Sequence, residues 1–243
     1  ASGARAEAGE LLRKTRNNTL TEREAKAVLA VYGVPVVTEL LSHTADEAVA
    51  AAERLGYPVV LKLESADLPH KTEAGVIRLN LRSASAVRGA FETIVANAGR
   101  VAPPPRIEGV LVQPMIPSGL EIMVGARVDP QLGPLLVVGF GGVLVELLKD
   151  TAVELAPVTH AEALGMLQRL KGAQLLQGFR GSDSIDLDRL ADILGRIGEL
   201  ASDQRDSIAE IDVNPLICHQ QRIVAVDALI AKSQKHGMQE PMS

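Results

Sequence analysis

The chain has 243 residues, of which 47% are hydrophobic and 23% charged, and its net charge is −5. This balance is typical of a folded globular protein with one large or two modest domains. Lys and Arg are scattered along the sequence and aromatic residues make up only 2%. Nucleic-acid binding is therefore not expected, because it needs a basic patch and side chains that stack on bases. The single cysteine, Cys218, excludes an intramolecular disulfide and a zinc site built from cysteines.

Neither a targeting signal nor a membrane segment is expected. Residues 1–10 lack the apolar core of a signal peptide. The most apolar stretch, 132–148, contains Pro134 and several glycines and is shorter than the roughly 20 residues that a membrane span needs. We therefore expect a cytoplasmic protein without a membrane partner.

The N-terminal part predicts alternating helices and strands. Residues 1–20 show little periodicity and are expected to be a linker or a frayed N-terminus. Thr21 and Glu24 have the spacing of a capping box, which starts a helix that ends at Gly33. The next elements, in order, are a strand start at 34–38, a helix at 44–56, a strand at 57–63, a polar loop at 64–75, a strand at 76–81 and a helix at 85–98.

A stiff segment, 99–107, contains three consecutive prolines and is the best internal boundary. We expect a first lobe at 21–105, whose helix 21–33 is a candidate to pack on the other lobe, and a second lobe at 106–232 followed by a tail at 233–243. The second lobe should contain strands at 110–113, 121–127, 135–139, 143–148, 208–213 and 222–228, with helices near 159–171 and 186–203. Mixed elements with hairpin-like strand pairs favour an α+β fold in two lobes.

Two short segments of the first lobe carry candidate functional residues. Lys62 ends an almost wholly apolar strand, where a lysine that extends to solvent and a rigidly held ammonium that binds phosphate are equally good explanations. His70 and Lys71 lie in the polar loop. A loop histidine is ordinarily only solvated, but an adjacent cation would also suit a histidine that is transiently phosphorylated.

Polar residues alternate along a strand near the C-terminus. If 210–215 is a strand, Glu210, Asp212 and Asn214 share one face. A second apolar strand ends in Asp227. Oxygen ligands on two adjacent strands suit Mg²⁺ with bound phosphates, although carboxylates that simply face water would explain the spacing equally well. The glycines at 139–142 do not complete a G-x-G-x-x-G pattern and favour a tight turn.

These segments form an ordered series: 59–62, 68–76, 108–115, 119–125, 139–143, 148–150, 210–216 and 226–228. The order and spacing closely resemble the ATP-grasp β subunit, or β-like domain, of ADP-forming acyl-CoA synthetases, which are related to the succinyl-CoA synthetase β subunit. The resemblance spans residues 20 to 232. It implies an ATP-grasp fold, in which two α+β lobes clamp a nucleotide.

The resemblance also implies roles for individual residues. In the nucleotide site, Lys62 would contact the phosphates, the hinge at Gln113, Pro114 and Met115 would offer backbone groups to adenine, and Glu121 would hold the ribose.

The resemblance implies further that the Mg²⁺ ligands would be Asn214 and Asp227. His70, with Lys71 beside it, would be a phosphohistidine station that carries phosphate to and from the nucleotide, and Asp212 would lie near the phosphohistidine.

The activity that the resemblance implies is that of an acid–thiol ligase, which converts acid, ATP and CoA into acyl-CoA, ADP and phosphate. Its cofactors would be ATP or ADP, Mg²⁺ and CoA. The chain has no Rossmann signature, so we expect a CoA-binding α subunit or fused α-like domain as partner in a hetero-oligomer, and a small carboxylic acid as substrate. The alternatives are a non-catalytic nucleotide- or acyl-CoA-sensing domain of a fused acetyltransferase and a carboxylate–amine ligase. The presence of His70 together with Asn214 and Asp227 favours catalysis.

Overall fold

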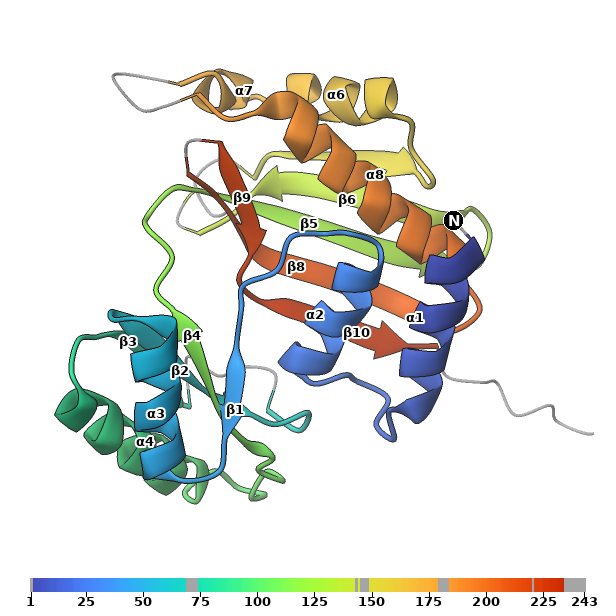
Figure 1. Ribbon diagram of the computed structural model, residues 1–243. Coiled ribbons are helices and arrows are strands. Elements are labelled where there is room, and N and C mark those ends of the chain that lie inside the picture. Colours follow the sequence, from blue (N-terminus) through green and yellow to red (C-terminus); the bar gives the residue numbers. More distant parts are fainter. Residues whose placement is uncertain are drawn as a thin grey trace, which may run out of the picture.

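The chain folds into two lobes, each built on its own antiparallel sheet (Figure 1). The computed structural model describes residues 2–68, 74–142, 144, 149–178, 184–219 and 221–233. Within them the first sheet has the strand order β1-β4-β2-β3. The second has the order β10-β8-β5-β6-β7, with β9 paired to β8. The α+β content and two-lobed arrangement that the sequence predicts are confirmed.

The first lobe packs two helices against one face of its sheet. Val59, Leu61 and Leu63 lie in an apolar core with α3 and α4, so the alternate residues of the same strand, among them Lys62, point to the opposite face. The elements are β1 (Leu40–Ser42), α3 (Ala45–Leu55), β2 (Val59–Glu64), β3 (Ile77–Leu81), α4 (Ala84–Ala98) and β4 (Gly109–Pro114). Because β2 is buried on both faces, its sequence is a nearly continuous apolar run.

The lobe boundary expected between residues 105 and 106 is wrong. β4 pairs with both β1 and β2, so it is an inner strand of the first sheet and not the start of the second lobe. The prolines at 103–105 connect α4 to β4 within one lobe. The chain crosses to the second lobe only after Pro114, which is a position without a strong compositional signal.

The second lobe packs α8 across one face of the larger sheet (Figure 1). This helix is strongly amphipathic and buries Leu190, Leu194 and Ile197. The expected strand at 143–148 falls almost entirely outside the described residues. The elements are β5 (Leu120–Asp129), β6 (Gly133–Phe140), β7 (Thr151–Leu155), α6 (His160–Arg169), α7 (Ala173–Leu176), α8 (Leu187–Asp203), β8 (Ile208–His219), β9 (Arg222–Ala225) and β10 (Ala228–Lys232).

The expectation that residues 1–20 form a linker or frayed end is wrong for most of that segment. The helix α1 (Ser2–Lys14) packs beside α2 (Glu22–Val31), and its Ala8 and Leu12 are buried in the core of the second lobe. So few apolar residues give little periodic signal in the sequence. The Thr21 capping box is confirmed, and α2 packs on the second lobe although it precedes the first in the chain.

Two smaller differences concern strands. The strand expected at 34–38 is reduced to an isolated bridge between Val36 and Ala225. The strand expected at 222–228 ends at Ala225 as β9, and a separate strand, β10, begins at Ala228; the two pair with different halves of β8. The expected tail lies outside the described residues from residue 234 onward. No helix in the described part of the chain has the length and hydropathy to cross a bilayer.

Candidate functional site

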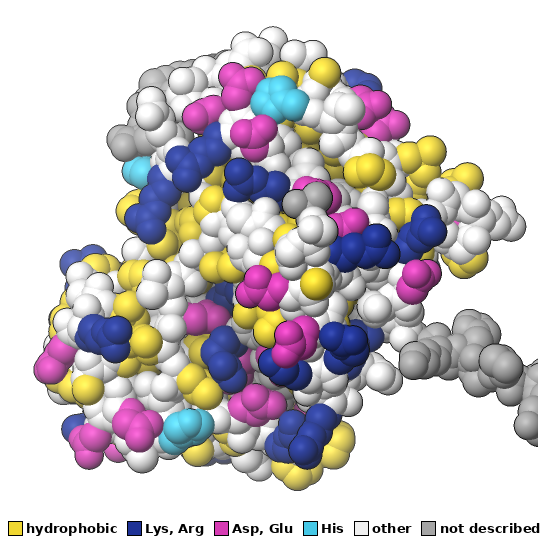
Figure 2. Space-filling model, turned by 45° about the vertical axis from the view of Figure 1, so that its right-hand side comes forward, with side chains coloured by type: hydrophobic (Ala, Val, Ile, Leu, Met, Phe, Trp, Pro, Cys, Tyr) yellow, Lys and Arg dark blue, Asp and Glu magenta, His cyan; other side chains and the backbone are white. Residues whose placement is uncertain are grey.

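The two lobes meet at a cluster of buried and half-buried polar side chains rather than in a shared apolar core. Acidic and basic side chains gather over the face that carries α1 and α2 (Figure 2). Within the junction, charged and amide groups from both lobes are in direct contact. We call this group the junction cluster: Glu22, Lys26, Glu39, Lys62, Gln113 and Asp227.

Lys62 is not at a strand end, as the sequence suggested, but within β2 and only 5% exposed. Its Nζ donates to Glu22 Oε1 at 2.9 Å and to the carbonyl oxygen of Val226 at 3.2 Å, and lies 3.6 Å from Asp227 Oδ2. The explanation that Lys62 extends into solvent is therefore excluded. Its ammonium connects the first lobe to the segment of the second lobe between β9 and β10.

Glu22 is the shared acceptor of the junction cluster. Its Oε1 also accepts hydrogen bonds from Lys26 Nζ at 2.8 Å and from Gln113 Nε2 at 3.0 Å. Both Lys26 and Gln113 also contact Glu39, the latter at 2.7 Å. With three carboxylates and two ammonium groups, the cluster carries a formal charge of −1. Such a site can accept further positive charge.

The carboxylates around Lys62 decide its charge. Burial by itself lowers the pKa of a lysine, because it penalises the ammonium form. The carboxylates of Glu22, Asp227 and Glu39 outweigh that effect and raise the pKa of Lys62 above its ordinary value. Lys62 is therefore a permanent cation at neutral pH, as a group that binds phosphate must be.

The candidate Mg²⁺ ligands lie beside this lysine. The backbone N–H of Asn214 donates to the carbonyl oxygen of Asp227 at 3.2 Å, which brings the two residues together. Ile211 and Val213 are buried while Asn214 is exposed, so the polar residues of β8 share the face away from the core, as predicted.

The charge around these ligands also suits a cation. Burial, and then the nearby carboxylates of Glu210 and Asp227, raise the pKa of Asp212, and a cation would relieve this repulsion. Among the described residues, no group of three or more His, Cys, Asp and Glu side chains is arranged to hold a metal. One amide and one carboxylate oxygen fit Mg²⁺, which commonly takes few protein ligands and completes its shell with phosphates and water.

The glycine-rich segment after β6 closes around Glu121. The N–H of Gly141 donates to the carbonyl oxygen of Glu121 at 2.7 Å. A Cβ on Gly142 would lie 2.6 Å from Glu121 Oε2, and its φ of +56° is one that other residues rarely adopt. This segment forms the tight turn that the sequence predicts, and it fixes the candidate ribose ligand.

The candidate hinge has a buried side chain and a partly occupied backbone. Gln113 is fully buried, and its Oε1 has no hydrogen-bond partner among the described residues. Pro114 and Met115 are half-buried, and the N–H of Met115 donates to the carbonyl oxygen of Pro58 at 2.9 Å. In this state that N–H is engaged within the protein and not free to bind a base.

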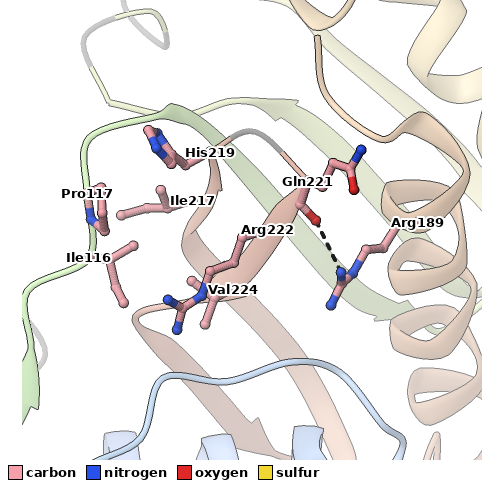
Figure 3. A pocket seen from close by; sticks show the side chains of 8 residues that line it. All are labelled: Ile116, Pro117, Arg189, Ile217, His219, Gln221, Arg222 and Val224. Carbon is pink, nitrogen blue, oxygen red and sulfur yellow. Dashed lines mark hydrogen bonds between the residues drawn. The ribbon is translucent and has the colours of Figure 1, made fainter. Parts of the chain in front are cut away.

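A pocket of 380 Å³ lies just beyond the hinge (Figure 3). Ile116, Ile217 and Val224 give it an apolar wall, and His219 and Arg222 line it with polar groups. Ile217 pairs with Glu121 across β5 and β8, so the two side chains share a face of the sheet. The pocket therefore adjoins the positions expected for the base and the ribose. This pocket could not be predicted from the sequence, because its residues come from separate segments.

His70 and Lys71 lie outside the described residues, so their roles remain predictions. The sequence also missed Glu22, Lys26 and Glu39. The spacing of Glu22 and Lys26 by four residues is an ordinary sign of an exposed helix pair. Their burial depends on contact with the first lobe, and no pattern of neighbouring residues in the sequence indicates that contact.

Comparisons with known proteins identify the family of the chain. The ATP-grasp domain family matches residues 11–231. The β subunit of ADP-forming acetate–CoA ligase I from Pyrococcus furiosus is 39% identical over 225 residues, which cover 92% of this chain and 97% of that subunit. The chain belongs to the ATP-grasp family of ADP-forming acyl-CoA ligase β subunits.

Two further relatives have the same region in other settings. The ADP-forming 4-hydroxybutyrate–CoA ligase of Nitrosopumilus maritimus is 39% identical over 85% of this chain, which corresponds to only 29% of that longer protein. The dinucleotide-forming acetyl-coenzyme A synthetase 1 of Ca. Korarchaeum cryptofilum, solved with coenzyme A and Ca-AMPCP, is 38% identical with a TM-score of 0.88, covering 95% of this chain and 100% of that one. Another complex of that synthetase contains Mg-AMPPCP and has its phosphohistidine segment pointing towards the nucleotide site.

The burial of Lys62 predicts a large cost for removing its charge. Lys62→Met should lower the free energy of unfolding by about 3 kcal/mol, because carboxylates of the junction cluster lose a buried counter-charge. As a control, Lys14→Met removes an exposed partner of Glu10 and should leave the free energy of unfolding almost unchanged. Urea denaturation measures both. Equal small effects would mean that the junction cluster is solvated in solution.

Proposed function

We propose that this chain is the nucleotide-binding part of an ADP-forming acyl-CoA synthetase, with ATP or ADP held between the lobes. The observation that carries the proposal is the position of Lys62, a buried cation 3.6 Å from a candidate Mg²⁺ ligand at the junction of two ATP-grasp lobes. Lys62 would bind phosphate, Glu121 the ribose, and the hinge at 113–115 the base, through backbone groups other than the N–H of Met115, which donates to Pro58. Asn214 and Asp227 would hold Mg²⁺, which would offset phosphate charge when bound.

The chemical step assigned to this chain is transfer of a phosphoryl group between nucleotide and histidine. A nitrogen of His70 attacks the terminal phosphorus of ATP, so that an N–P bond forms, the P–O bond to ADP breaks and ADP leaves. Neutral imidazole is available near pH 7 because the ordinary pKa of histidine is near 6.5. The covalent carrier divides one difficult transfer into two easier ones. Lys71 would offset the phosphate charge, and Asp212 would lie near the carrier.

The partner is a CoA-binding α subunit or a fused α-like domain, which would bind CoA and the small carboxylic acid. Some relatives are separate β subunits, and others carry this region within a longer chain. The regulatory alternative, a sensing domain of an acetyltransferase, finds no support in these relatives, which are named as ligases or as a synthetase.

Nucleotide binding by this chain alone is the first test. MgATP at 100 times its Kd should stabilise the fold by about 2.7 kcal/mol, because it binds the folded state only. Isothermal titration calorimetry and thermal unfolding with the same samples measure this effect. If folded protein shows no heat of binding with millimolar MgATP or MgADP, the proposal is wrong.

The relay is tested by reconstitution. Alone, the chain should make no acyl-CoA from ATP, CoA and a carboxylic acid, and addition of the α partner should start synthesis. His70→Ala should abolish synthesis yet change the Kd for MgATP less than two-fold, because it leaves the proposed nucleotide and Mg²⁺ ligands in place. Acid-labile, base-stable phosphate should form on the wild-type chain and not on the variant. Synthesis by the His70→Ala complex at the wild-type rate would contradict the relay.

A further inference from the structure

We infer that Glu22 is a positioning residue that fixes the ammonium of Lys62 for the nucleotide phosphates, an inference that rests on the function proposed above. Lys62 is carried by the first lobe, but the groups that orient it belong to the second. Glu22 begins α2, which packs on the core of the second lobe, and Val226 and Asp227 lie between β9 and β10. Lys62 therefore takes its orientation from the lobe that also carries the candidate Mg²⁺ ligands.

The hydrogen bonds of Lys62 show how the orientation is set. An ammonium has three N–H donors. One is engaged by Glu22 Oε1 at 2.9 Å and one by the carbonyl oxygen of Val226 at 3.2 Å. Asp227 Oδ2, at 3.6 Å, is too far for a direct hydrogen bond but is within ion-pair distance. The two hydrogen bonds thus leave one N–H donor of Lys62 for a phosphate oxygen, beside the candidate metal ligand Asp227.

Glu22 is itself held in place. The Thr21 capping box fixes the start of α2, and a carboxylate in the first turn is favoured by the helix dipole. The side chain is 1% exposed and its Oε1 accepts from Lys26 and Gln113 as well as from Lys62. Lys26 compensates the charge of Glu22, so the carboxylate can stay ionised in the buried junction. A rigid anion is what preorganisation of Lys62 requires.

A positioning role and a purely structural role for Glu22 predict different effects on ligand binding. If Glu22 only joined the lobes, its loss would weaken the binding of every ligand that needs both lobes. If it positions Lys62, its loss matters only for ligands with phosphates, and only while Lys62 is present. Gln113 keeps its bond to Glu39 without Glu22, so the hinge retains a partner.

The test is a double-mutant cycle on ligand affinity. Calorimetry would measure Kd for MgATP and for adenosine with the wild type, Glu22→Gln, Lys62→Met and the double variant. Glu22→Gln should weaken MgATP binding at least ten-fold and change adenosine binding less than two-fold. In the Lys62→Met background it should have no further effect on MgATP. The control Glu162→Gln alters an exposed first-turn carboxylate of α6 and should change neither Kd.

Several results would overturn the inference. For Glu22→Gln they are an unchanged Kd for MgATP, an equal loss of affinity for adenosine, or a loss of MgATP affinity that persists in the Lys62→Met background. Tighter MgATP binding would also overturn it, because it would show that Glu22 competes with phosphate. If Glu22→Gln does not fold, the variant Glu22→Gln/Lys26→Met takes its place in the cycle, because it removes one charge of each sign. If neither variant folds, Glu22 is a structural ion and the inference is wrong. A wild type that binds neither ligand would instead refute the proposed function.

Discussion

The carboxylate of Glu22, shared by two ammonium groups and one amide, is the interaction on which the site depends. One oxygen accepts from Lys26, Lys62 and Gln113. The apolar cores of the lobes are separate clusters, so these polar contacts carry much of the connection between them. Buried ionic contacts demand good geometry, because each charge has lost its hydration. The junction therefore specifies one relative placement of β2 and the candidate metal ligands.

A polar junction suits a protein that must admit a charged ligand between its lobes. An apolar interface would have to be opened against the hydrophobic effect at each cycle. In the junction cluster, a phosphate can instead accept from the remaining N–H donor of Lys62 beside Asp227, and a cation can offset the excess negative charge. The contact between Arg23 and Glu64 adds a second polar link, with the N–H of Arg23 3.3 Å from Glu64 Oε1.

The sequence predicts much of the fold because its signals are local. The Thr21 capping box, the helix expected near 186–203 and the alternation around Asp212 each depend on neighbouring residues, and the structure confirms them. The proline segment was misleading, because stiffness marks a connection but not which sheet the next strand joins. The α1 helix was missed because only Ala8 and Leu12 are buried there.

The site was predictable to the extent that it rests on ordered motifs. Lys62, Asn214 and Asp227 were singled out from their positions on strands, and the structure brings them together. The residues that orient them could not be found in the same way. Glu22 and Lys26 are separated from Lys62 by more than thirty residues, and their burial depends on the contact between α2 and the first lobe.

A crystal structure of this chain with Mg²⁺ and a non-hydrolysable ATP analogue tests the central claim most directly. The metal should lie between Asn214 and Asp227. Lys62 Nζ should keep its hydrogen bond to Glu22 while it donates to a phosphate oxygen. A nucleotide bound elsewhere, or a Lys62 that has left Glu22 to reach the phosphate, would contradict it.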